Sequence, residues 1–194
     1  MRTARQFAFA LALCCAATAL CFAGQQPAGA PAPSTPTLNT ELDKELSVIE
    51  QEVVGLADAM PEDKYSFAPS NGEFKGVRTF GDQAKHVAAV NYIFAAAILG
   101  EKPPVDTGEE SGPASVKSKT DIMNYLKDSF TYLHQAAASV SEKNLVAPVK
   151  SPFGEGSVTR LALASGAVAH CFDHYGQMVE YLRMNGIIPP ASRQ

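Results

Sequence analysis

The chain has 194 residues and a formal net charge of −4, and 46% of its residues are hydrophobic. This length and composition are sufficient for one folded domain with an extensive apolar core. Because the balance is acidic and no basic cluster is present to neutralise phosphates, nucleic acid is excluded as the expected partner.

The N-terminus has the features of a secretory signal peptide. Arg2 and Arg5 give it a positive start, and residues 7–22 are almost wholly apolar. Cys21 and Ala23 place small residues at the −3 and −1 positions of a cleavage site. The apolar run is shorter than the ~20 residues that a membrane-spanning helix needs, although an uncleaved anchor is the alternative. Residues 1–23 are therefore predicted to be cleaved, which implies export to the periplasm or the medium and no stable membrane association afterwards.

Cleavage after Ala23 would change the cysteine content and the charge of the chain. It would leave Cys171 as the single cysteine, so the mature protein could form no internal disulfide and would depend on its core for stability. It would also lower the formal charge from −4 to about −6 by removing two arginines. Residues 24–38 are rich in proline, alanine and polar residues, which predicts a flexible linker. The folded domain is predicted to span residues 39–194.

Four amphipathic helical patterns follow the linker, and no segment shows a convincing strand pattern. In each pattern apolar residues recur at spacings of three and four, the period of one helix face. The first opens with Thr40 and Asp43 as a variant of the capping box, and the third has Ser118 and Asp121 as cap residues. The four patterns cover residues 40–60, 79–100, 118–140 and about 157–186. The predicted fold class is therefore all-α, a four-helix bundle with long crossover connections.

Two of the connections in this bundle are longer than tight turns require. Residues 101–117 and residues 146–156 are both rich in glycine, proline and serine. Loops of this length in a compact domain usually serve as crossovers, lids or walls of a site. The first is interpreted as a crossover, and the second is placed to cover the mouth of a site on the helix that follows it.

Three histidines form a candidate metal site. His170 and His174 are separated by four residues, so both imidazoles point to the same side of the predicted fourth helix. His86 lies in the second helical pattern. Three imidazoles from two helices can hold one divalent cation and leave coordination positions free for water or substrate.

The residues around these histidines resemble a known family. The resemblance rests on MPEDKYSFAP, on RTFGDQAKHVA, and on AHCFDHYGQMVEYLRMNGIIPP near the C-terminus. Together they resemble the DinB-like superfamily, which includes the YfiT-type metalloproteins, from Leu42 to about Ser192. The family pattern has one histidine early in the second helix and an H-x-x-x-H pair in the fourth. The resemblance implies that His86, His170 and His174 are the ligands of a divalent metal ion.

Other polar residues near these motifs have two interpretations each. Asp173 either accepts a hydrogen bond that orients a histidine ring or is solvated. Asp82 either orients a histidine ring in the same way or stabilises the start of the second helix. Gln177 either bonds a ligand or lines the cavity. Cys171 is interpreted as a packed core thiol, because one residue of helix rotates it about 100° away from the histidine face. His134 is interpreted as a residue near a helix end that meets the helix dipole, and not as a ligand.

The sequence leaves three classes of function open. The first is a metal-dependent enzyme acting on an unknown small molecule, for which the resemblance implies hydrolase or thiol-transferase chemistry. The second is a bundle that binds a metal or small ligand without turnover, and the third is a structural protein whose histidines are a relic. The predicted cofactor is a divalent ion such as zinc, nickel, iron or copper, which three imidazoles do not distinguish. The sequence also leaves open whether two copies form a homodimer.

Overall fold

The structure is a computed structural model that describes residues 35–193. The predicted signal peptide and most of the predicted linker lie outside these residues. Four long helices, two short strands and two short 3-10 helices make up the described part of the chain. The helices are α1 (Leu38–Ala59), α2 (Phe80–Leu99), α3 (Lys119–Ser139) and α4 (Arg160–Met184). The predicted all-α bundle is confirmed.

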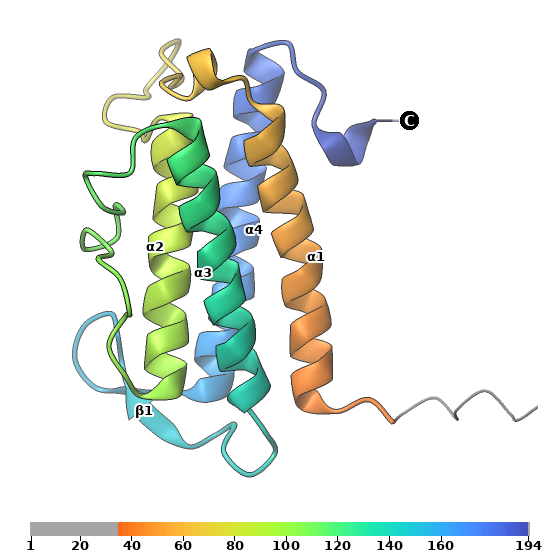
Figure 1. The fold of residues 1–194 in the computed structure, drawn as a ribbon, viewed down its shortest axis with the longest axis vertical. Helices are drawn as coiled ribbons and strands as arrows, with labels where there is room; N and C mark the ends of the chain where they lie inside the picture. Colours follow the sequence, from red (N-terminus) through yellow and green to blue (C-terminus); the bar gives the residue numbers. More distant parts are fainter. Residues whose placement is uncertain (1–34, 194) are drawn as a thin grey trace, which may run out of the picture. The chain divides into compact units, whose positions relative to one another are not determined.

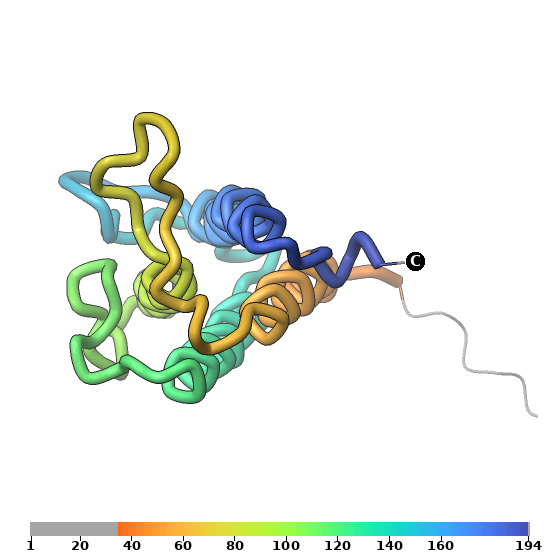
Figure 2. Tube along the Cα trace, turned by 90° about the horizontal axis from the view of Figure 1, so that it is seen from above, coloured from red at the N-terminus to blue at the C-terminus, as the bar shows by residue number. Residues whose placement is uncertain are grey.

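The four helices pack side by side along a common direction (Figure 1). α1 and α4 run one way, and α2 and α3 run the other way, so α2 and α3 are parallel neighbours. The connection between these two helices, residues 100–118, therefore has to return along the length of the bundle, as a crossover must. Seen from the end, α2 lies between α3 and α4 (Figure 2). The prediction of a crossover at residues 101–117 is confirmed.

The core lies between the inner faces of all four helices. Phe80 of α2 and Phe130 of α3 are fully buried, as are Leu56 of α1 and Leu182 of α4. Burying an aromatic or leucine side chain of this kind stabilises a fold by roughly 1.5–3 kcal/mol. Because α2 contacts both α3 and α4, it is buried on most of its circumference, and its many alanines allow that close approach. The core thus holds α2 and α4, which carry the candidate ligands, against each other.

The start of α1 corrects the predicted boundary. The N-cap is Thr37, and its partner in the capping box is Thr40, whose hydroxyl accepts a hydrogen bond from the Thr37 N–H at 2.9 Å. Leu38, assigned to the linker by its composition, is the first residue of the helix and packs against the core. The predicted pairing of Thr40 with Asp43 is wrong because a threonine three residues earlier already supplies the cap.

The other helix ends follow their sequence signals. Thr79 and Thr159 are the N-caps of α2 and α4, and Ser118 forms a capping box with Asp121 at the start of α3. In each case a side-chain oxygen accepts a hydrogen bond from a backbone N–H that has no partner within its helix. These caps fix where α2 and α4 begin, and therefore which side chains of the two helices face each other.

The sequence predicted no strands, and this prediction is wrong because the structure contains one short hairpin. Strands β1 (Pro148–Lys150) and β2 (Ser157–Thr159) pair in antiparallel fashion, with Val149 opposite Val158. Three residues are too few to show the alternation by which strands are recognised in a sequence. The hairpin precedes α4 directly, and its loop, residues 151–156, extends along the side of the bundle that carries the histidines. None of the described helices is long and apolar enough to span a membrane.

Candidate metal centre

His86 lies in α2 and is oriented by the crossover connection. Its side chain is 5% exposed, and its Nδ1 lies 2.6 Å from the backbone carbonyl oxygen of Glu110. A carbonyl can only accept, so Nδ1 carries the proton and donates it, which leaves the lone pair of a neutral ring on Nε2. Many metal-binding histidines are oriented in this way, by a carbonyl behind the ring. The crossover therefore fixes both the tautomer and the direction of His86.

His170 and His174 approach His86 from α4, as their spacing predicts. The ring centroid of His86 lies 5.0 Å from that of His170 and 4.7 Å from that of His174. The Nε2 atoms of His86 and His170 are 3.1 Å apart. The Nδ1 atoms of His170 and His174 are buried and have no hydrogen-bond partner in the structure. Unpartnered buried nitrogens are costly, so this cluster has unmet bonding capacity.

The geometry of the cluster fits a metal ion. One nitrogen from each histidine can be chosen so that all three lie within 4.8 Å of one another. Two nitrogens bound to one tetrahedral ion at 2.0–2.1 Å would be about 3.4 Å apart, close to the separation of the two Nε2 atoms. Among the described residues this is the one such group of three or more histidine, cysteine or acidic side chains. The structure thus contains a three-histidine cluster that is compatible with metal binding.

The surroundings keep the cluster uncharged at neutral pH. Burial lowers the pKa of His170 to about 3 and the pKa of His174 to about 4, and it also lowers the pKa of His86. His174 and His86 further lower the pKa of His170, and His86 further lowers the pKa of His174, because protonated neighbours would repel. A metal ligand must present a lone pair, which only the neutral ring has. The three rings are therefore in the protonation state that a metal requires.

An apolar rim surrounds the opening of the cluster. The histidines line a small cavity of about 220 Å³ together with Val90, Phe94 and Phe153. The rings of Phe94 and Phe153 meet edge to face with centroids 5.3 Å apart, and the Phe94 ring is 6.2 Å from that of His170. Phe153 belongs to the hairpin loop, so the prediction that residues 146–156 reach the mouth of the site is supported at this residue.

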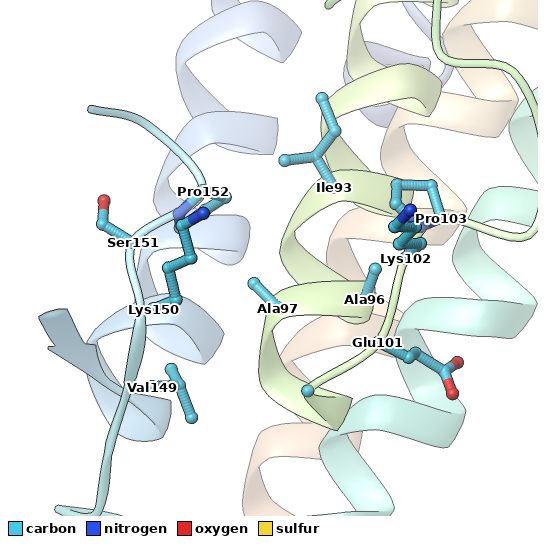
Figure 3. Close-up of a pocket in the computed structure, with 11 residues that line it drawn as sticks. Ile93, Ala96, Ala97, Glu101, Lys102, Pro103, Val149, Lys150, Ser151 and Pro152 are labelled. Atoms are coloured by element: carbon cyan, nitrogen blue, oxygen red, sulfur yellow. The ribbon is translucent and has the colours of Figure 1, made fainter. Parts of the chain in front are cut away.

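A larger cavity lies further along α2 and contains no histidine. It measures about 570 Å³ and lies between the C-terminal half of α2 and the start of the hairpin loop. Figure 3 shows Ile93 and Ala97 of α2 on one side of it, with Val149 and Pro152 on the other. Pro152 lines this cavity and its neighbour Phe153 lines the histidine cavity, so the loop borders both. The larger cavity lacks the chemistry of the candidate site.

The polar residues next to the histidines do not contact their rings. Gln177 accepts a hydrogen bond from Gln83 at 2.8 Å and donates one to Asp173 at 3.1 Å. Asp173 is exposed and has no hydrogen bond to a histidine, which agrees with the solvated interpretation. Asp82 accepts a hydrogen bond from the Thr79 hydroxyl at 2.7 Å in the first turn of α2, which agrees with the helix-start interpretation.

Cys171 and His134 also lie apart from the cluster. Cys171 is fully buried, its Sγ lies 3.3 Å from Oδ1 of Asn91, and burial raises the pKa of its thiol to about 12. The core interpretation of Cys171 is therefore supported. His134 lies between α3 and α1, with one ring nitrogen 2.6 Å from Asp43 and the other 3.0 Å from Glu50. The two carboxylates of α1, and not the helix dipole, are its partners.

Two features of the site and one neighbouring residue were not predicted individually: the Glu110 carbonyl, Phe153 within the predicted covering loop, and Gln83. The Glu110 carbonyl and Phe153 come from loops, where no periodicity indicates which atoms reach the site. Gln83 is 3% exposed, and its Oε1 is buried without a partner. A signal for Gln83 existed, since it precedes His86 by three residues and therefore lies on the same side of α2.

Comparisons with known proteins agree with this fold. The sequence model of the DinB superfamily matches residues 45–178. A solved DinB-like protein from Bacillus cereus superposes with a TM-score of 0.60 at 16% identity, covering 78% of this chain and 95% of its own. A DinB-like protein from Bacillus subtilis superposes with a TM-score of 0.60 at 18% identity. This match covers 79% of this chain and 99% of the Bacillus subtilis protein. No curated protein sequence matches the chain.

These findings define the class of protein. A four-helix bundle with a parallel crossover, carrying one histidine on α2 and two on α4, is similar in fold to the two Bacillus proteins. The family match covers more than half of the chain. The chain belongs to the DinB superfamily, as the residues around the histidines had indicated.

Proposed function

We propose that the protein binds one divalent metal ion through His86, His170 and His174 and uses it as a metal-dependent enzyme acting on a small molecule. The observation that carries the proposal is the convergence of three neutral, largely buried imidazoles from two helices. Desolvating these rings is unfavourable unless their nitrogens gain a partner, and two of the Nδ1 atoms have none. A bound cation would give a partner to one nitrogen of each ring.

Different residues of the chain would have different roles in such a site. The three histidines would hold the ion, and the Glu110 carbonyl keeps the His86 lone pair directed at it. A divalent ion held there would supply Lewis acidity and would lower the pKa of bound water. The apolar rim of Val90, Phe94 and Phe153 limits water access and favours a compact or apolar reacting group.

Hydrolysis and thiol transfer are the two reaction types to test. The resemblance favours both, whereas export would remove the protein from the abundant thiols of the cytoplasm. The alternative is a bundle that binds metal or a small ligand without turnover. The size of the histidine cavity favours this alternative, because about 220 Å³ is below the roughly 300–1,000 Å³ typical of small-molecule sites.

The experiment that decides between them is elemental analysis followed by assays. We expect protein purified from its native compartment to carry zinc, nickel, iron or copper, and a panel of ester, amide and thiol-transfer substrates to show turnover that follows metal content. Turnover should disappear on chelation and return on reloading with the same metal. Metal without turnover would favour the binding bundle. Protein without metal, even after incubation with each ion, would contradict both and leave the histidines as a relic.

We also propose export, supported by the charge, apolar run and small residues of the N-terminus. The mass of protein recovered from the periplasm or the medium should correspond to a chain that starts at Gly24. Replacing Ala23 with leucine puts a large residue at the −1 position, so the variant should retain its N-terminus and accumulate with the membrane fraction. Exported protein with an intact Met1 would contradict cleavage, and protein found wholly in the cytoplasm would contradict export.

A further inference from the structure

A cationic cavity adjoins the candidate metal centre. It measures about 470 Å³ and is bounded by the segment before α2, the first turns of α2, and the crossover. It lies beside the histidine cavity, because Lys85 precedes His86 in α2 and Ser111 follows Glu110 in the crossover. Its lining residues are Gly76, Val77, Arg78, Asp82, Lys85, Ser111, Gly112 and Ala114.

Lys85 is held in place by the crossover. A Cβ atom built on Gly112 would lie 3.1 Å from Cβ and 3.2 Å from Cε of Lys85, so the glycine backbone rests directly on the lysine stem. Two residues earlier, the Glu110 carbonyl receives the His86 hydrogen bond. The same turn of the crossover thus positions a metal-ligand candidate and its neighbouring lysine together.

The backbone of Arg78 is held from the other side by α4. The hydroxyl of Tyr181 donates a hydrogen bond to the Arg78 carbonyl at 3.0 Å, and Tyr181 follows His174 by seven residues, two turns of the same helix. The Arg78 side chain is exposed and lines the cavity. Arg78 therefore lines this cavity, and not the histidine cavity, from a backbone that α4 holds in place.

The two cations have no protein counter-ion. In the part of the chain that the structure describes, neither Arg78 nor Lys85 forms an ion pair. Asp82 is the single carboxylate side chain in the lining, and its Oδ2 accepts the hydrogen bond from Thr79. Two cations that line one cavity with a single carboxylate leave a net positive charge that an anion can neutralise.

We infer that the cavity of Arg78 and Lys85 is a subsite for an oxyanion group, a carboxylate or a phosphate, on the molecule that the histidine centre acts on. Arg78 offers a planar fork of N–H donors and Lys85 a compact charge, a pair that suits either group. The inference rests on the proposed function for the role of the anion as part of a substrate. The cavity's own affinity for an anion can be measured without it.

The test is a calorimetric titration of the full, metal-free chain at low ionic strength, with inorganic phosphate and, separately, with acetate. Metal-free protein is used so that neither anion can bind an ion in the histidine centre. We expect saturable binding of at least one anion, and the anion that binds identifies the group. Because charge-assisted hydrogen bonds are lost, Arg78→Gln and Lys85→Met should each weaken that binding roughly tenfold or more.

Two further variants guard against loss of structure as the explanation. Asp82→Asn keeps an acceptor for Thr79 and removes the one negative charge in the lining, so it should tighten anion binding several-fold. Disruption of the fold cannot mimic a gain in affinity. Lys75→Met removes an exposed cation from the same segment as Arg78 without touching the cavity, and should leave binding unchanged.

The outcomes separate this inference from the proposed metal site. No saturable binding of either anion, equal weakening by Lys75→Met, or weaker binding by Asp82→Asn would each overturn the inference. Native protein that binds metal but neither anion would overturn the anion subsite alone. Native protein that binds phosphate or acetate in an Arg78-dependent manner, but binds none of the four metals, would uphold the subsite and overturn the metal centre.

Discussion

Replacing His174 with alanine should abolish tight metal binding and make the protein insensitive to chelators. The substitution removes one of three nitrogens that lie within 4.8 Å of one another. Loss of a group that merely orients a ligand costs roughly 10–100-fold in metal affinity, so loss of a ligand should cost more. The His174 Nδ1 atom has no hydrogen-bond partner, so no protein hydrogen bond to that atom is lost with the side chain.

The thermal stability of the native protein gives an independent measurement. A metal that binds only the folded state adds about 2.7 kcal/mol at a free concentration of 100 times Kd. For a domain of this size that corresponds to a change in Tm of about 5–10 °C. We expect EDTA to lower the Tm of native protein by this amount and to leave the Tm of His174→Ala unchanged.

His134 supplies the matched control. It is a histidine of α3 that contacts Asp43 and Glu50, away from the cluster. His134→Ala should retain full metal content and the full response to EDTA. A native protein that does not respond to EDTA, together with a His174→Ala variant that keeps its metal, would show that the cluster is not a metal site.

Most of the fold could be predicted from local signals in the sequence. Ser118 and Asp121 were recognised as cap residues and form a capping box in the structure, because a helix start depends on a few neighbouring side chains. The start of α1 was placed two residues late for the opposite reason. The prolines around Thr37 gave its segment the composition of a linker, although Thr37 and Thr40 alone are sufficient to cap the helix.

The candidate site was predictable only in part. The four-residue spacing of His170 and His174 directs them to the same side of α4. His86 was proposed as their partner from its place in a second helical pattern, and the family resemblance supported it. The spacing of residues could not reveal the Glu110 carbonyl, because every residue has one and only the path of the crossover brings this one to His86. Phe153 reaches the site from a hairpin loop, where no periodicity indicates which residue lies at the mouth.

Gly108→Ala is the second substitution from which we expect a large effect on metal binding. Gly108 lies in the turn that presents the Glu110 carbonyl to His86. Gly108 has a φ of +53°, and a Cβ atom there would lie 2.2 Å from the Gly112 carbonyl oxygen. An alanine cannot be accommodated without opening the turn, in which Gly112 donates a hydrogen bond to Thr107 at 2.8 Å. The Glu110 carbonyl would move with it, and His86 would lose the acceptor that fixes its tautomer.

We therefore expect Gly108→Ala to weaken metal binding roughly 10–100-fold, the usual cost of losing a group that orients a ligand. The four helices should remain folded, because the turn lies in the crossover outside them.

Gly100→Ala is the matched control. Gly100 also has a positive φ, +79°, but nothing lies within 4 Å of its Cβ position. This variant should lose about 1–2 kcal/mol of stability from the strained backbone and keep native metal affinity. Titration of both variants with the native metal measures the difference, and native affinity in Gly108→Ala would mean that the Glu110 carbonyl does not orient His86 for metal binding.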